Sequence, residues 1–184
     1  MDTSMGFTPL AGVLMGTRCG DIDPAIVPYI MQKENMSADE VASYMNKKCG
    51  YIGLTKGFSS DSRDLEQAIA NGPSDPNYER ANLAVNILTH GIKKYIGAYA
   101  AAMGGVDVII FAGGVGENQA DCREAVLEGL EFIGVELDKE VNAKMRGEEA
   151  VLSTPNSRVK VLLIPTDEEL MIASDTYDIV KGIK

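Results

Sequence analysis

A glycine-rich segment, residues 111–118, combines residue types that bind anionic ligands. It reads FAGGVGEN and follows an apolar run. Glycines let the backbone come close to a ligand, and N–H groups at the start of a helix favour anions. Glu117 and Asn118 have side chains that can hydrogen-bond a ribose or a base edge. The order of the glycines matches neither G-x-G-x-x-G nor the Walker A pattern. The segment predicts a ligand-binding loop, with a merely tight strand–helix turn as the alternative.

A second segment, residues 15–24, reads MGTRCGDIDP and carries Arg18 between glycines. A guanidinium group on an exposed loop can fork onto phosphate or carboxylate oxygens. Taken alone, such an arginine is more often paired with a neighbouring carboxylate, here Asp21 or Asp23. The residues therefore leave both an anion-binding arginine and an ordinary loop ion pair open.

Two further polar clusters stand at the starts of expected helices. Residues 59–64 read SSDSRD, and on their own they are best explained by helix capping through Ser60 or Asp61. Residues 164–169 read IPTDEE just after an apolar run, where carboxylates can hold Mg²⁺ beside nucleotide phosphates. Acidic residues in a first helical turn are also good partners for the helix dipole. The single histidine, His90, is expected in the core or at an interface.

The elements that must position these residues alternate between helix and strand. Buried strands of the parallel type are expected at 106–111 and 159–164, because both runs are almost continuously apolar. A Ser37–Glu40 capping box predicts one of the helices. One helix is expected to begin at Pro24. The others are expected to span about 37–48, 62–70, 76–103, with Asp75 as the cap, 119–132 and 168–181. In the long helix, burial on several faces is expected for Tyr95–Met103. This order indicates an α/β layered fold.

Length and composition indicate one ordinary globular domain. The chain has 184 residues, a formal net charge of −10 and 45% hydrophobic residues. An acidic chain repels phosphate backbones, so a broad nucleic-acid-binding face is not expected. The sequence holds no run of the roughly 20 apolar residues that a bilayer-spanning helix needs, so no membrane association is expected. The three cysteines have no metal-ligand spacing and are expected to be free thiols of a cytoplasmic protein.

The four polar segments agree with one another. Two of them follow parallel-type strands, at the edge where such sheets bind ligands. Together they could provide a nucleotide-binding loop, an arginine that binds an anion and a carboxylate that binds a metal. This combination indicates phosphoryl transfer, in which catalysis consists mostly of positioning and charge neutralisation.

Five segments closely resemble the acetate kinases and the related propionate kinases. They are DTSMGFTPL at 2–10, MGTRCGDIDP at 15–24, KKYIGAY at 93–99, FAGGVGEN at 111–118 and IPTDEEL at 164–170. The resemblance follows the whole chain in order, but only the C-terminal half of the family. It implies an α/β fold of the actin-like ATPase, ribonuclease H-like kind. Residues 1–184 would form a single C-terminal lobe without the N-terminal lobe, and the sheet would lack its first strand and expose an edge.

The resemblance also implies roles for individual positions. Arg18 matches the arginine that stabilises the transferring phosphoryl group, and Pro9 matches a residue of the acyl pocket. Glu168 matches a Mg²⁺ ligand. The two nucleotide-binding segments match Asp61, Ser62 and Arg63, and Gly114, Val115, Gly116, Glu117 and Asn118. Ser62 departs from the family pattern, because relatives usually carry a bulky Phe or Met there.

Two hypotheses follow for the function. In the first, the chain is the nucleotide-binding half of an acetate kinase, which transfers phosphoryl groups between ATP and acetate to give ADP and acetyl phosphate. The implied partners are ATP or ADP, a short-chain acyl substrate, Mg²⁺ and a second copy in a homodimer. We expect the isolated chain to be inactive, because aligning the reacting groups needs both lobes. In the second, the chain is a non-catalytic dimerisation or nucleotide-binding module.

Overall fold

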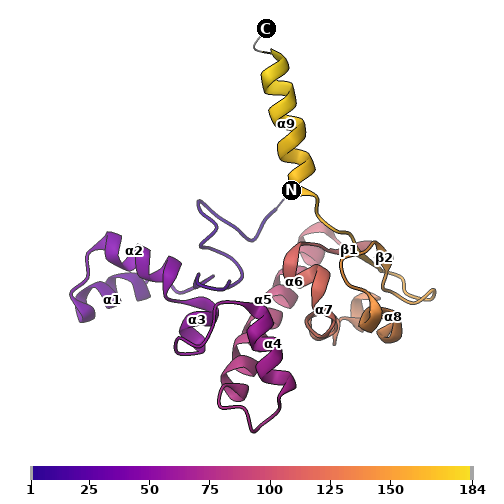
Figure 1. Ribbon diagram of the computed structural model, residues 1–184. Helices are drawn as coiled ribbons and strands as arrows, with labels where there is room; N and C mark the ends of the chain where they lie inside the picture. Colours follow the sequence, from indigo (N-terminus) through magenta and orange to yellow (C-terminus); the bar gives the residue numbers. More distant parts are fainter. Residues whose placement is uncertain (1, 183–184) are drawn as a thin grey trace. The chain divides into compact units, whose positions relative to one another are not determined.

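The computed structural model describes residues 2–182, which fold into two compact units that are divided between Gly105 and Val106. The first unit is entirely helical and the second combines helices with a small sheet (Figure 1). This composition is α/β, as the sequence indicates. Each unit is stabilised by its own core and is described separately below.

The first unit contains the five helices α1 to α5. Their bounds are α1 Ile26–Glu34, α2 Ala38–Lys47, α3 Gly50–Leu54, α4 Ser62–Ala70 and α5 Tyr78–Met103. Helices α3 and α4 pack against α5, where Leu65 of α4 and Ala81 and Ala84 of α5 are fully buried. Small residues on α5 therefore let α4 approach closely.

Local signals fix several boundaries in this unit. Ser37 and Glu40 form the expected capping box at the start of α2, and α4 spans 62–70 as predicted. Helix α1 begins at Ile26 rather than at Pro24, because the carboxylate of Asp23 accepts the N–H of Ala25 in a turn. Helix α5 similarly begins at Tyr78, two residues later than the predicted Pro76.

The expectation of burial for Tyr95–Met103 is wrong. Only Ala100 of this stretch is buried, and Met103 is 67% exposed. The buried residues of α5 lie mainly between Ala81 and Thr89, since α3 and α4 are the helices of this unit that contact it most. His90 is exposed rather than in the core. Apolar composition therefore overestimates how much of this helix its own unit covers.

The second unit contains a three-stranded sheet of order β1-β3-β2. Strands β1 (Val108–Phe111) and β3 (Lys160–Leu163) pair in parallel, as predicted, and β2 (Ala150–Val151) pairs antiparallel with β3. The helical elements of this unit are α6 Gly113–Asn118, α7 Ala120–Leu127, the 3₁₀ turn Glu131–Ile133, α8 Lys139–Lys144 and α9 Glu168–Gly182.

One face of this sheet is buried and the other is open. Ile109 and Phe111 of β1 face the core, whereas Val108 and Ile110 are exposed. The prediction of a strand buried on both faces is therefore wrong, because the buried side chains of β3 lie on the same face as Ile109 and Phe111.

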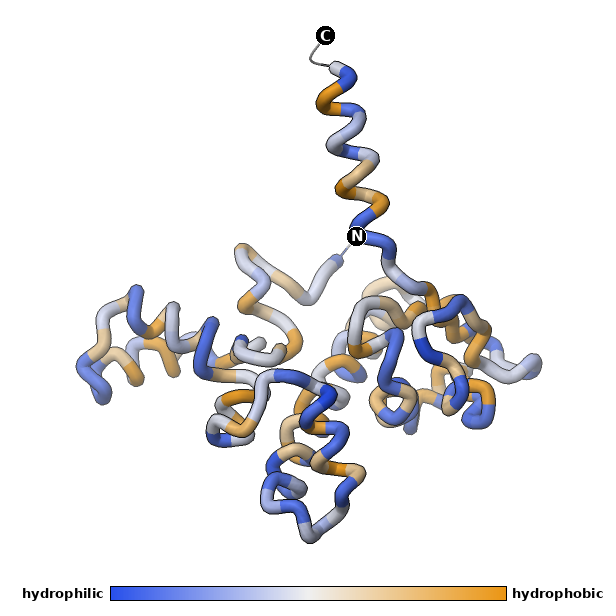
Figure 2. The backbone as a smooth tube through the Cα atoms, viewed as in Figure 1, coloured by the Kyte–Doolittle hydropathy of each residue, from blue (hydrophilic) through white to orange (hydrophobic). Residues whose placement is uncertain are grey.

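One helix of the second unit is shorter than the sequence predicts, whereas α9 (Glu168–Gly182) agrees with the predicted span of about 168–181. The helix expected at 119–132 ends at Leu127, because Gly129 adopts a left-handed conformation with φ of 79°. Helix α9 extends away from the rest of its unit and buries none of its residues (Figures 1 and 2). Among residues 2–182, no helix combines the length and the apolar content needed to cross a membrane.

Candidate functional site

The loop that carries Arg18 is held between the ends of two helices. Two of its groups donate to carbonyls at the C-terminal end of α2: the Thr17 hydroxyl to Asn46 at 2.8 Å and the Cys19 N–H to Met45 at 3.1 Å. Three of its carbonyls accept N–H groups at the start of α3. These pairs are Cys49 to Thr17, Tyr51 to Met15 and Ile52 to Gly16, each at 3.0 Å. The loop thus satisfies backbone groups that helix ends leave unpaired.

The side chain of Arg18 makes no ion pair with the carboxylates of the described chain, which rules out the loop ion pair with Asp21 or Asp23. Its guanidinium Nη1 donates to the sulfur of Met15 at 3.4 Å. Asp21 instead accepts hydrogen bonds from the Gly12 N–H and the Tyr95 hydroxyl, which lower the pKa of its carboxyl. Arg18 lines a shallow hollow with Thr17, Ala42, Ser43, Asn46 and Lys47. Two cations in one hollow are suited to an anion.

The segment with Asp61, Ser62 and Arg63 begins α4 and lies beside the Arg18 loop. Gly16 packs so closely on the backbone of Ser60 that a Cβ there would stand 2.4 Å from its carbonyl oxygen. This contact brings two of the predicted site segments together within the first unit. Pro9, the predicted acyl-pocket residue, is exposed in the same unit.

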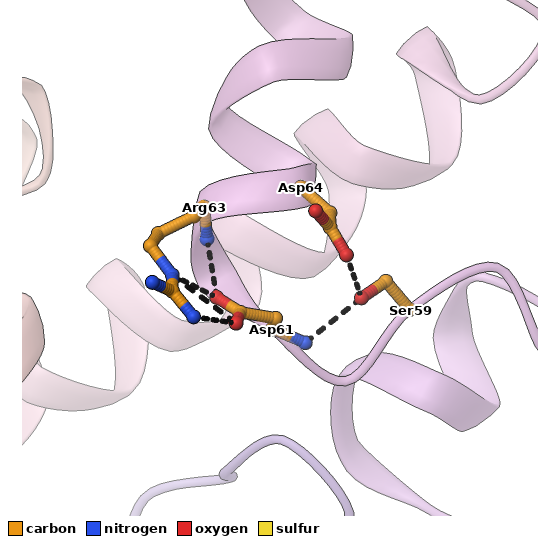
Figure 3. Close-up of polar contacts among 4 residues, drawn as sticks. All are labelled: Ser59, Asp61, Arg63 and Asp64. Atoms are coloured by element: carbon orange, nitrogen blue, oxygen red, sulfur yellow. Dashed lines mark hydrogen bonds and ion pairs between the residues drawn. The ribbon is translucent and has the colours of Figure 1, made fainter.

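Asp61 performs the capping role that the residues alone favoured. Its carboxylate accepts the N–H of Arg63 at 2.9 Å, and the Arg63 side chain pairs with it at 2.5 Å (Figure 3). These contacts lower the pKa of Asp61 to about 2. The Ser59 hydroxyl donates to Asp64 and accepts the N–H of Asp61. Arg63 remains 84% exposed despite its ion pair, so its outer face is open to a ligand.

The glycine-rich segment forms a short helix, α6, rather than the predicted loop. Its N-cap residue, Ala112, has no polar side chain, and Glu117 takes over the capping role. Glu117 Oε1 accepts the N–H of Gly113 at 2.7 Å. The same oxygen accepts the N–H and the hydroxyl of Thr166, at 2.9 and 2.7 Å. One carboxylate therefore joins the segment after β1 to the segment after β3.

Because all three donors favour the charged carboxylate, they lower the pKa of Glu117 from its usual 4.5. The stabilisation is fully present above that value and is lost as the pH falls through the lower, folded-state value. We expect the thermal stability of the wild type to fall more steeply below about pH 4.5 than that of Glu117→Gln, whose amide does not titrate. Unfolding temperatures from pH 7 to pH 3 check this.

Glu169→Gln is the matched control, because Glu169 is exposed in the first turn of α9. It should follow the wild-type curve. Superimposable curves for the wild type and Glu117→Gln would contradict the assigned role of Glu117.

Glu168, the predicted metal ligand, stands in the first turn of α9, next to the helix cap. Asp167 caps this helix by accepting the N–H of Leu170 at 2.9 Å, and Glu168 is exposed. The described residues contain no group of three or more His, Cys, Asp or Glu side chains arranged to hold a metal. A single carboxylate fits the way Mg²⁺ is usually bound, through one or two carboxylates, waters and substrate phosphates.

The structure also identifies Arg123, which the sequence analysis missed. This residue of α7 is fully buried and donates to the carbonyls of Gly116 and Glu117, at 2.9 and 3.1 Å. The sequence signal for it exists, since Arg123 shares a helical face with the buried Val126 and Leu127. An arginine on an apolar stripe must find partners inside the protein.

The family model, the related sequences and the related structures all match this chain to acetate or propionate kinases. The model of the acetokinase family matches residues 1–174. An acetate kinase from Bacteroides thetaiotaomicron is 58% identical over 181 residues, which are 98% of this chain and 44% of that protein. The crystal structure of Porphyromonas gingivalis acetate kinase matches with a TM-score of 0.87 and 51% identity, over 96% of this chain and 43% of that one. The crystal structure of a propionate kinase from Francisella tularensis matches with a TM-score of 0.82 and 37% identity, over 94% of this chain and 42% of that one. The chain thus spans less than half the length of these relatives.

Proposed function

The chain belongs to the acetokinase family, and we propose that it supplies the nucleotide-binding and metal-binding segments of an acetate kinase. The proposed reaction is phosphoryl transfer between ATP and acetate or a similar short-chain acid. The observation that carries the proposal is the Glu117–Thr166 contact. It ties the GGVGEN segment to the segment that precedes Glu168, so the proposed nucleotide and metal ligands share one edge of the sheet.

The proposed mechanism gives separate tasks to the residues of this chain. In the second unit, Gly114, Val115, Gly116 and Asn118 would form one nucleotide-binding segment. In the first unit, Asp61, Ser62 and Arg63 would form another. Arg18, whose guanidinium faces no carboxylate in the described chain, would stabilise the charge of the phosphoryl group during transfer. Pro9 would line the acyl pocket. Glu168 would hold Mg²⁺, which supplies neutralisation of phosphate charge when it is bound.

The best test of the proposed site is calorimetric titration of MgATP into the chain. Glu168→Gln should weaken MgATP binding about tenfold, a change of about 1.4 kcal/mol, while binding of ATP without metal stays the same. The reason is that an amide oxygen has no charge with which to replace the carboxylate beside a divalent cation.

Glu169→Gln provides the matched control, because it removes the neighbouring carboxylate in the same helical turn. It should bind MgATP as the wild type does. A wild-type chain that takes up no MgATP at millimolar concentration would refute the proposed nucleotide site, and equal effects of the two variants would refute the assignment of Glu168.

We propose that the chain alone does not turn over acetate. It spans about 44% of the length of its relatives, and phosphoryl transfer depends on alignment of both substrates. A hydroxamate assay for acetyl phosphate should give no signal above background. Turnover at ordinary enzyme rates would show instead that residues 1–184 carry the complete site.

The exposed apolar residues of α5 and the cysteines bear on the oligomeric state and the cellular compartment of the chain. We propose a cytoplasmic homodimer. Helix α5 leaves Leu83 and Met103 more than half exposed, which supports a second copy as partner. Cys19 and Cys49 are free thiols, which supports a reducing compartment. Light scattering tests the dimer, and a monomer mass at every concentration would refute it. Localisation of a fluorescent fusion in cells tests the compartment.

A further inference from the structure

Arg123 uses its whole hydrogen-bonding capacity inside the second unit. Its Nε donates to Asn142 Oδ1 at 2.8 Å, and its Nη1 donates to the carbonyls of Gly116 and Glu117. Its Nη2 donates to the carbonyls of Asn142 and Met145, at 2.9 and 2.8 Å. An arginine side chain has five N–H groups, so each of them has an acceptor.

None of these acceptors is a carboxylate. The carbonyls belong to the C-terminal ends of two short helices. Gly116 and Glu117 lie in the last turn of α6, Asn142 lies in the last turn of α8, and Met145 is the C-cap residue of α8. Helix C-termini carry partial negative charge, which offsets the charge of the guanidinium. Burial lowers the pKa of Arg123, yet a guanidinium group stays protonated in proteins. The unit thus contains a buried cation balanced by backbone dipoles.

Helix α6, whose end Arg123 binds, has a low intrinsic helix propensity. Three of the six residues of α6 are glycines, and glycine has the lowest helix propensity of any residue except proline. Its N-terminal end is held by Glu117, through Gly113 and Thr166. Its C-terminal end is held by Arg123. Two side chains of opposite charge therefore fix a segment that has little intrinsic preference for its conformation.

We propose that Arg123 is a positioning residue for nucleotide binding. By holding the carbonyls of Gly116 and Glu117, it keeps residues 114–118 in the conformation that receives the nucleotide, so that binding does not have to order them. This inference rests on the function proposed above. It assigns a role to a residue that touches no ligand itself and acts through the backbone of the binding segment.

The test compares Arg123→Lys with Asn142→Ala in the full chain. Lysine keeps the positive charge, but its single ammonium group lacks the planar set of donors with which the guanidinium reaches the carbonyls of both α6 and α8. Asn142→Ala removes the contacts of the amide to Arg123 Nε and to the Ala120 carbonyl, and it leaves the contacts of Nη1 in place. It therefore controls for general loss of packing in the same network.

Two readouts separate positioning from stability. MgATP affinity, measured on folded protein, should fall about tenfold in Arg123→Lys and stay within twofold of the wild type in Asn142→Ala. Amide hydrogen exchange without nucleotide should be faster at residues 113–119 in Arg123→Lys only. Equal loss of affinity in both variants, or wild-type affinity and exchange in Arg123→Lys, would overturn the proposal.

The exchange measurement also separates this inference from the proposed function. If the wild type binds no MgATP, the proposed function fails, while exchange at residues 113–119 still decides whether Arg123 orders the segment.

A second variant covers the case in which Arg123→Lys does not fold. Arg123→Ala leaves a space that ethylguanidinium can enter, and this ion should restore MgATP affinity, whereas ethylammonium, which lacks the fork, should not. Equal restoration by both ions would contradict a role for the guanidinium geometry.

Discussion

Replacing Gly50 with alanine is expected to destabilise the first unit by about 3 kcal/mol or more. Gly50 begins α3 with φ of 59°, a conformation that costs an L-residue about 1–2 kcal/mol. A Cβ at this position would also stand 1.9 Å from the carbonyl oxygen of Met15 and 2.8 Å from that of Arg18. Both atoms are backbone, so relief requires the loop to move, and overpacking of this kind costs about 1–3 kcal/mol.

Urea unfolding followed by circular dichroism measures this loss, and Gly57→Ala is its matched control. Gly57 has φ of 90°, yet a Cβ there would meet no atom within 4 Å. It should therefore lose only the backbone term, about 1–2 kcal/mol. The difference between the two variants is the cost of displacing the Arg18 loop. If both variants lose the same amount, the close packing of Gly50 against Met15 has no energetic consequence.

Replacing Arg123 with methionine is expected to lower the free energy of unfolding by about 3–5 kcal/mol, because buried acceptors lose their donor. Methionine fills similar space, but it donates no hydrogen bond. The carbonyls of Gly116, Glu117, Asn142 and Met145 would then lose their shared partner. The carbonyls of Glu117 and Asn142 keep a second donor, the N–H groups of Gly147 and Met145. The loss therefore falls mainly on the carbonyls of Gly116 and Met145, and a buried acceptor without a partner costs about 1–3 kcal/mol. Urea unfolding again provides the measurement.

Arg158→Met is the control for the second prediction. Arg158 also donates to a main-chain carbonyl, that of Ile133, but it does so at the surface. Water replaces its contact, so the loss should stay below about 1 kcal/mol. A wild-type unfolding midpoint for Arg123→Met would show that the two helix ends do not depend on the guanidinium.

Sequence patterns predicted the elements whose signals are local. The capping box of α2 and the Asp61 cap of α4 are examples, because a few neighbouring side chains decide them. The parallel pairing of β1 with β3 was also predictable, since apolar runs followed by turn residues and helices are typical of parallel sheets. The candidate residues at the ends of these strands were found in the same way.

Long-range contacts explain what the sequence did not predict. The glycines of α6 indicate a loop by propensity. The segment is helical because Glu117, which Thr166 holds from the segment after β3, caps its start, and because Arg123 of α7 binds the carbonyls near its end. The exposed faces of Val108 and Ile110 depend on which elements cover the sheet. Neither the partners of a buried side chain nor the cover on a strand is encoded in periodicity.

The contacts of the Arg18 loop join residues that are closer in the sequence than the residues paired between β1 and β3, so the two units are expected to fold at different rates. The bonds between the Arg18 loop and helices α2 and α3 connect residues of a region no longer than 15–52. Strand β1 pairs with β3, which follows much later in the sequence, since Val108 is paired with Lys160 and several helices lie between them along the chain. Contacts that close longer loops form more slowly. Stopped-flow refolding should therefore show the second unit reaching its final state after the first.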